Sequence, residues 1–167
     1  MKNLILISGT MGAGKTAVSH ELRKILPKNV FLDGDWCWMA QPFVVTDETK
    51  EMVMENITFL LAQFLRCSAY ENVIFCWVLH QQSIQDAILK RLDTKNCDIK
   101  CFSLTADEKS LRERLEADVR KGIRTADVID RSIARIPLYL SLNTIQIDTS
   151  GKNVPDVAAE IKIFSHV

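Results

Sequence analysis

Short runs rich in apolar residues alternate with longer segments in which apolar residues recur every three or four positions. The short runs predict five buried strands: residues 4–8, 29–32, 72–79, 97–104 and 144–148. The longer segments predict amphipathic helices: residues 17–26, 47–65, 81–92, 107–115, 125–140 and 154–164. Strands that alternate with helices are typical of a doubly wound α/β domain built on a parallel sheet.

Local signals mark where several of these helices begin or break. Thr46 or Asp47 can cap the second helix, and residues 105–108 match a capping box at the start of the fourth. Pro137 interrupts the segment 125–140, so we expect a break there. Residues 37–45 have no clear periodicity and are expected to be irregular.

The segment between the first strand and the first helix carries the most specific motif. Residues 9–16 read GTMGAGKT and fit G-x-x-x-x-G-K-[ST], the phosphate-binding loop, in the strand-loop-helix context that the motif requires. Glycines let backbone N–H groups converge on phosphate oxygens, and the helix N-terminus adds its own unpaired N–H groups. The motif predicts that Lys15 reaches the β- and γ-phosphates of ATP and that the Thr16 hydroxyl ligates Mg²⁺. The other expected phosphate ligands are Gly12, Ala13 and Gly14.

Two carboxylates follow the second strand in the turn Asp33-Gly34-Asp35. Because ligands of open α/β sheets bind beyond the carboxyl ends of the strands, we expect this turn to lie near the phosphate-binding loop. Phosphoryl transfer to an alcohol needs one carboxylate near Mg²⁺ and another that orients the acceptor hydroxyl and accepts its proton. An Asp-Gly turn selected only for its conformation is the alternative interpretation.

Charge and cysteine content narrow the range of functions. The 21 basic and 21 acidic residues balance, which gives no electrostatic signature of nucleic-acid or membrane-surface binding. Basic residues concentrate between Arg112 and Arg135, which indicates either an anion site or a solvated helix face. The five cysteines form no C-x-x-C pair and indicate reduced thiols. With no signal peptide and no apolar run of membrane-spanning length, a cytoplasmic protein is expected.

Four features together resemble the small P-loop kinases: the loop 9–16, the turn 33–35, the basic stretch 114–135 and the closing residues 147–150. This group comprises shikimate kinase, gluconate kinase and nucleoside-monophosphate kinase, with chloramphenicol phosphotransferase and zeta-toxin-like kinases as relatives. The resemblance spans essentially the whole chain. It implies an α/β P-loop NTPase fold: a three-layer sandwich with a five-stranded parallel sheet, helices on both faces and a short lid.

The resemblance also implies an organisation and an assignment of the two carboxylates. It implies one domain over residues 1–167, with a substrate-binding segment at about 36–66 and a lid at about 116–127. It places Asp33 nearer Mg²⁺ and Asp35 nearer the acceptor, although the reverse assignment stays open.

Arginines in and after the lid complete the predicted site. The resemblance implies that Arg120 and Arg124, which flank Gly122, are catalytic, because mobile arginines stabilise the charge on a transferring phosphoryl group. Arg131 and Arg135 are one helical turn apart and can face the same phosphates.

These features predict a kinase that uses ATP and Mg²⁺ to phosphorylate a small-molecule acceptor. A hydroxyl metabolite is favoured over a nucleotide, because no arginine for an acceptor phosphate lies between Lys28 and Gln63. A nucleotide or nucleoside kinase is the first alternative. The strand 72–79 ends without the aspartate of a Walker B motif, so an ATP-binding regulator without turnover is the second. A GTPase is rejected, because Asp148-Thr149-Ser150-Gly151 matches D-x-x-G only at the far end of the chain, without N-K-x-D.

Overall fold

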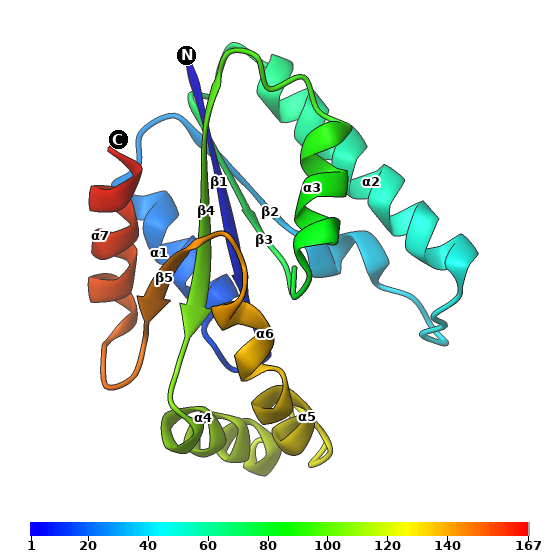
Figure 1. The fold of residues 1–167 in the computed structure, drawn as a ribbon, viewed down its shortest axis with the longest axis vertical. Coiled ribbons are helices and arrows are strands. Elements are labelled where there is room, and N and C mark those ends of the chain that lie inside the picture. The colour runs from blue at the N-terminus through cyan, green and yellow to red at the C-terminus, as the bar shows by residue number, and fades with distance from the viewer. Residues whose placement is uncertain (167) are drawn as a thin grey trace.

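The computed structural model describes residues 1–166 and is built around a five-stranded, all-parallel β-sheet (Figure 1). The strands are β1 (Lys2–Gly9), β2 (Asn29–Asp33), β3 (Asn72–Cys76), β4 (Cys97–Thr105) and β5 (Ile145–Asp148), in the spatial order β2-β3-β1-β4-β5. The first strand therefore lies at the centre of the sheet. The predicted parallel α/β fold is confirmed.

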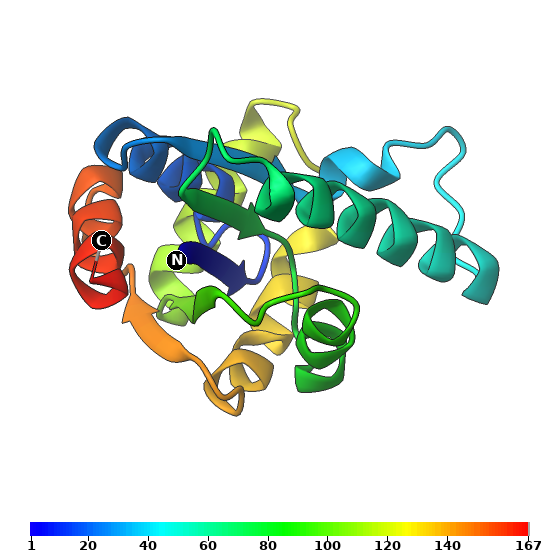
Figure 2. The ribbon, with the colours of Figure 1, turned by 90° about the horizontal axis from the view of Figure 1, so that it is seen from above.

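Helices cover both faces of this sheet (Figure 2). They are α1 (Lys15–Ile25), α2 (Asp47–Arg66), α3 (Gln82–Lys90), α4 (Glu108–Arg120), α5 (Val128–Ala134), α6 (Ile136–Leu140) and α7 (Val154–Ser165), with a short 3₁₀ helix, η1 (Gly34–Trp38), after β2. The predicted break near Pro137 is confirmed, since α5 ends at Ala134 and α6 begins at Ile136. Within residues 1–166 no helix has both the length and the apolar character that a membrane span requires.

The central strand is buried on both sides, which explains its unbroken apolar sequence. Successive side chains of a strand point to opposite faces of the sheet. Ile5 and Ile7 pack in one cluster with residues of α1 and α7, whereas Leu4 and Leu6 pack in the other with residues of α2 and α3. Because neither face of this stretch meets solvent, apolar side chains point to both faces from Leu4 to Ile7.

The third strand is shorter than predicted. Its sheet pairing ends at Cys76 rather than at Leu79, although the Trp77 amide still donates to the Ile7 carbonyl at 3.2 Å. Leu79 has a φ of 41°, in the left-handed region, and the chain leaves the strand direction there. The residues after Cys76 are therefore free to line the carboxyl edge of the sheet.

Helix caps agree with the prediction at α2 and differ at α4. Thr46 caps α2 as expected, and its hydroxyl accepts from a backbone amide of the first turn. The capping box predicted at residues 105–108 is wrong. Thr105 ends β4, and α4 is capped instead by Asp107, which accepts from the Ser110 amide at 2.7 Å. Because Thr105 belongs to the strand, the cap falls to Asp107, the residue next to the first turn, whose carboxylate reaches an open amide.

The packing of α2 on the sheet gives a stability prediction. Ile57 is fully buried, whereas Phe59, two residues later on the same helix, is 62% exposed. We predict that Ile57→Ala lowers the free energy of unfolding by about 2–5 kcal/mol, because it removes buried methyl groups and leaves a cavity. Phe59→Ala is the matched control and is expected to change it by less than about 0.5 kcal/mol. Urea denaturation measures both, and equal losses would contradict this orientation of α2.

Candidate functional site

The turn between β1 and α1 presents its backbone at the carboxyl edge of the sheet. Gly12 has a φ of 80°, and a Cβ atom there would lie 2.8 Å from the Leu115 side chain of α4, so glycine is required at this position. The Ala13 amide donates to the Thr10 carbonyl at 3.2 Å and closes the turn. The Ala13 side chain is buried in the core, so this residue can offer only its backbone to a ligand.

Helix α1 begins at this turn with its first amides available. Gly14 is its N-cap residue and makes no side-chain cap, which leaves the first-turn N–H groups without a capping side chain. Lys15 Nζ donates to the Thr10 carbonyl at 3.1 Å. Burial lowers the pKa of Lys15, and the nearby carboxylates of Asp33 and Asp35 partly oppose that effect. A helix N-terminus with an adjacent ammonium group is suited to bind an anion such as a phosphate.

Asp33 joins the second strand to the start of α1. The residue is 4% exposed, and its carboxylate accepts from the Thr16 hydroxyl at 2.7 Å and from the Asp35 amide at 3.1 Å. The hydrogen bond from Thr16 brings carboxylate and hydroxyl oxygens together. The hydrogen bond from the Asp35 amide shapes the η1 turn. Such oxygens are the ligands that Mg²⁺ prefers, with water and phosphate oxygens completing the shell. Thr16 and Asp33 therefore fit the requirements of a Mg²⁺ site beside a bound phosphate chain.

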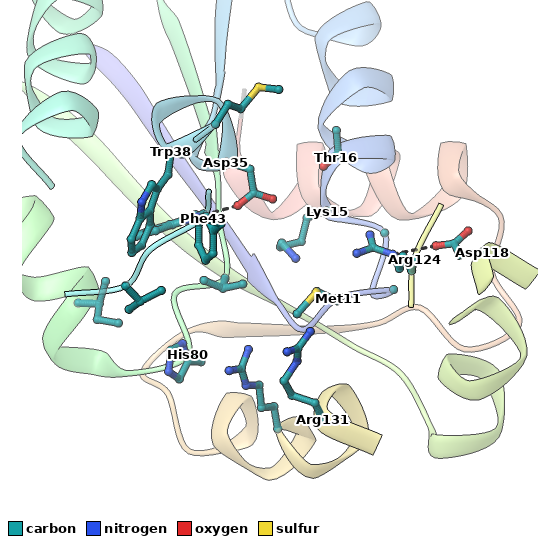
Figure 3. Close-up of a pocket in the computed structure, with 18 of the residues that line it drawn as sticks. Met11, Lys15, Thr16, Asp35, Trp38, Phe43, His80, Asp118, Arg124 and Arg131 are labelled. Carbon is teal, nitrogen blue, oxygen red and sulfur yellow. Dashed lines mark hydrogen bonds and ion pairs between the residues drawn. The ribbon is translucent and has the colours of Figure 1, made fainter. Parts of the chain in front are cut away.

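Asp35 lies two residues further on and faces the cavity (Figure 3). Trp77 Nε1 donates to its Oδ1 at 3.1 Å. Burial raises the pKa of Asp35, and Asp33 adds to the rise, whereas Lys15 and the Trp77 hydrogen bond lower it. The indole of Trp77 packs on Gly34, where a Cβ atom would lie 2.5 Å from Trp77 Cγ. Close packing and a hydrogen bond thus hold the Asp35 carboxylate in place.

These groups line one cavity with a volume of about 1260 Å³. Its basic side is formed by Arg114 of α4, Arg124 of the α4–α5 connection, Arg131 of α5 and Arg135 at the end of α5. Three of the predicted arginines are therefore brought to the same cavity as Lys15. Figure 3 shows Arg124 and Arg131 on different sides of the turn between β1 and α1.

The two predicted lid arginines occupy different environments. Arg124 lines the cavity and donates through Nε to the Asp118 carboxylate at 3.1 Å (Figure 3). Arg120 is the last residue of α4, is 70% exposed and lies 4.0 Å from the Glu116 carboxylate. In the described part of the chain, Arg120 is not among the residues that line the cavity.

Arg114 has a contact that the sequence pattern does not reveal. Its guanidinium donates to the Thr149 hydroxyl at 2.9 Å and to the Thr149 carbonyl at 2.6 Å. The bonds connect α4 to the turn that follows β5, so Arg114 holds two walls of the site together while it lines the cavity.

His80 lies on the opposite side of the cavity from Arg124 (Figure 3). Its Nδ1 is buried and has no hydrogen-bond partner among the described residues. Burial lowers the pKa of His80, and the positive charge of Arg135 lowers it further, so the neutral imidazole is favoured. It can therefore both donate and accept a hydrogen bond with a neutral ligand group.

Known proteins share a sequence family and a fold with this chain. Residues 5–133 match the AAA domain family. No curated protein matches the chain in sequence. Among solved structures, a gluconokinase from Sinorhizobium meliloti 1021 aligns with a TM-score of 0.71 and 17% identity, over 98% of this chain and 91% of that one.

Two further kinases share the fold. The APS kinase of Mycobacterium tuberculosis, in complex with AMPPNP and APS, aligns with a TM-score of 0.69 and 14% identity, over 99% of this chain and 98% of that one. The shikimate kinase of Acinetobacter baumannii, in complex with shikimate, aligns with a TM-score of 0.61 and 20% identity, over 98% and 93%. The chain belongs to the AAA domain family, and its fold is that of the small P-loop kinases.

Proposed function

We propose that this protein is an ATP- and Mg²⁺-dependent phosphotransferase that moves the γ-phosphoryl group of ATP to a hydroxyl of a small acceptor. The observation that carries the proposal is the arrangement around Lys15: it is the first residue of α1, and the Asp35 carboxylate lines the same cavity. At about 1260 Å³ the cavity exceeds the roughly 300–1,000 Å³ typical of a site for one small molecule. Two ligands can therefore meet in it.

Different residues have different roles in phosphoryl transfer. The backbone amides of Gly12, Ala13 and Gly14 and the ammonium group of Lys15 bind the β- and γ-phosphates. Thr16 and Asp33 would hold Mg²⁺, which when bound neutralises charge on the phosphate oxygens.

On the acceptor side, Asp35 accepts the proton of the acceptor hydroxyl. Because Trp77 occupies Oδ1 of Asp35, we assign this role to Oδ2.

The basic side of the cavity supports a role in binding and closure. Arg131 and Arg135 bind phosphate oxygens, and residues 116–127 act as a lid that moves Arg124 from Asp118 to the γ-phosphate. The segment 36–66 binds the acceptor, since Trp38, Phe43 and Lys50 within it line the cavity. We treat residues 1–167 as one functional unit.

An ATP-binding regulator without turnover is the second candidate. It is favoured by one observation: the residue that follows β3 is Trp77 instead of the acid of a Walker B motif. A nucleotide or nucleoside acceptor is the alternative within the kinase class. A coupled ADP-release assay over a metabolite panel, with mass spectrometry of the product, separates them. A phosphorylated product in proportion to ADP supports the kinase, whereas nucleotide binding without product supports the regulator.

One prediction of this function concerns Lys15. We predict that Lys15→Ala lowers kcat by at least about 10²-fold, because it removes a charged donor from the transferring phosphoryl group. Circular dichroism and urea denaturation should show an intact fold. The matched control is Lys24→Ala on the same helix, where the ammonium group is exposed and pairs with Glu21. Turnover that survives Lys15→Ala unchanged would remove Lys15 from the mechanism.

The lid arginines give another prediction. Arg124→Ala should lower kcat by about 10²-fold, because its guanidinium already lines the cavity and can reach the transferring group on a short movement. Arg120→Ala, measured in parallel, tests whether lid closure also brings Arg120 into the cavity; a similar loss would show that it does. Full activity in Arg124→Ala would contradict the proposed lid.

Trp77 gives a prediction of pH dependence. Asp35 acts as a base only when ionised, and the Trp77 hydrogen bond stabilises the ionised form and so lowers its pKa. Trp77→Phe keeps an aromatic ring on Gly34 but removes the donor, so the pKa of Asp35 should rise. The acid limb of the kcat–pH profile should therefore move to higher pH. Trp36→Phe, at a half-exposed residue outside the cavity lining, is the control. An acid limb that does not move, or moves to lower pH, would exclude this role of Trp77.

A further inference from the structure

The part of the cavity opposite Arg124 is lined mainly by apolar side chains. They come from two segments, one running from the end of η1 toward α2 and the other from the end of β3 into the first turn of α3: Trp38, Phe43, Val45, Trp77, Val78 and Ile84. Figure 3 shows Trp38, Phe43 and His80 on one side of Lys15, with Arg124 and Asp118 on the other. The cavity thus has a charged half for phosphates and an apolar half that begins at Asp35.

Two of these apolar side chains, Phe43 and Val45, are exposed instead of packed in the core. Phe43 is 60% exposed and Val45 is 56% exposed, and both lie in the segment 39–46, which has no regular secondary structure. The rings of Trp38 and Phe43 contact each other, with centroids 4.9 Å apart and planes inclined by 47°. Large apolar side chains that gather on a concave wall mark a surface for an apolar ligand group.

Few polar side chains line this half of the cavity. Lys50, His80 and Gln81 line it in addition to Asp35, and Arg135 of the charged half lies near His80. A polyhydroxylated acceptor would place several hydroxyl groups against aromatic and aliphatic side chains, and each unpaired hydroxyl withdrawn from water weakens binding. A molecule with a single reactive hydroxyl and an apolar body would match the lining.

We infer that the acceptor is an alcohol or phenol with an apolar body, most suitably aromatic, rather than a polyol. Its body packs against Trp38 and Phe43, and its hydroxyl points to Asp35. This inference rests on the phosphotransferase function proposed above and specifies its acceptor class. The acceptor oxygen bonds to the γ-phosphorus, and the bond from that phosphorus to the β–γ bridging oxygen breaks. ADP leaves with the electron pair, and the hydroxyl proton passes to Asp35.

The test compares apolar alcohols with polyols on one protein sample. Indole-3-ethanol and 2-phenylethanol represent the first class, and glycerol and D-gluconate represent the second. Calorimetric titration of the protein loaded with AMPPNP and Mg²⁺ measures binding, and ADP release with ATP measures transfer. We expect the apolar alcohols to bind at least tenfold more tightly than the polyols. Equal or tighter binding of the polyols would overturn the inference.

A matched pair of variants assigns the preference to this wall. Phe43→Ser should reduce the affinity for indole-3-ethanol about tenfold and leave the affinity for AMPPNP unchanged, which also reports an intact fold. Phe59→Ser replaces an equally exposed phenylalanine of α2 that lies outside the cavity lining of the described chain, and it should retain the wild-type affinity. An unaffected Phe43→Ser variant, or the same loss in both variants, would refute the assignment.

The two readouts separate this inference from the function on which it rests. If apolar alcohols bind to the nucleotide-loaded protein but receive no phosphoryl group, the inferred ligand class is supported. The proposed phosphotransferase function is then contradicted. If polyols are phosphorylated and apolar alcohols do not bind, the proposed phosphotransferase function stands and the inferred class of acceptor is wrong.

Discussion

The close approach of the β1–α1 turn to α4 is the contact on which the rest of the site depends. Gly12 lies so near Leu115 that no side chain fits between them, and Leu115 is itself fully buried. The same helix carries Arg114 and Asp118 into the cavity wall. Because a buried leucine holds α4 against the turn, the backbone amides of the turn and the neighbouring Arg114 keep a set distance. A rigid cradle of this kind lowers the cost of ordering charged groups around a phosphate.

The acidic side is organised by the register of two neighbouring strands. Asp33 pairs with Cys76 across β2 and β3, so the residues that follow, Gly34 and Trp77, leave the sheet side by side. The absence of a side chain at Gly34 lets the indole pack on the turn, from which its N–H reaches Asp35. A tryptophan after β3 thereby orients the carboxylate on the neighbouring turn instead of supplying an acid of its own.

Most of the fold could be predicted because its signals are local. Buried parallel strands need unbroken apolar runs, and the parallel arrangement brings the ends of β1 and β2 to one edge, so Thr16 and Asp33 were expected to be near each other. Contacts between distant segments could not be predicted in this way. The Trp77–Asp35 bond spans 42 positions and depends on strand register, and the direction of Arg124 depends on how the chain turns after α4. No periodic pattern encodes either contact.

The most direct measurement is a crystal structure of the protein with AMPPNP and Mg²⁺. If the account is right, the triphosphate lies in the turn formed by residues 9–16, with its terminal phosphate within hydrogen-bond distance of Lys15 Nζ and directed toward Asp35. Mg²⁺ should be found beside Thr16 and Asp33. A triphosphate bound elsewhere, or one whose terminal phosphate points away from Asp35, would contradict phosphoryl transfer at this site.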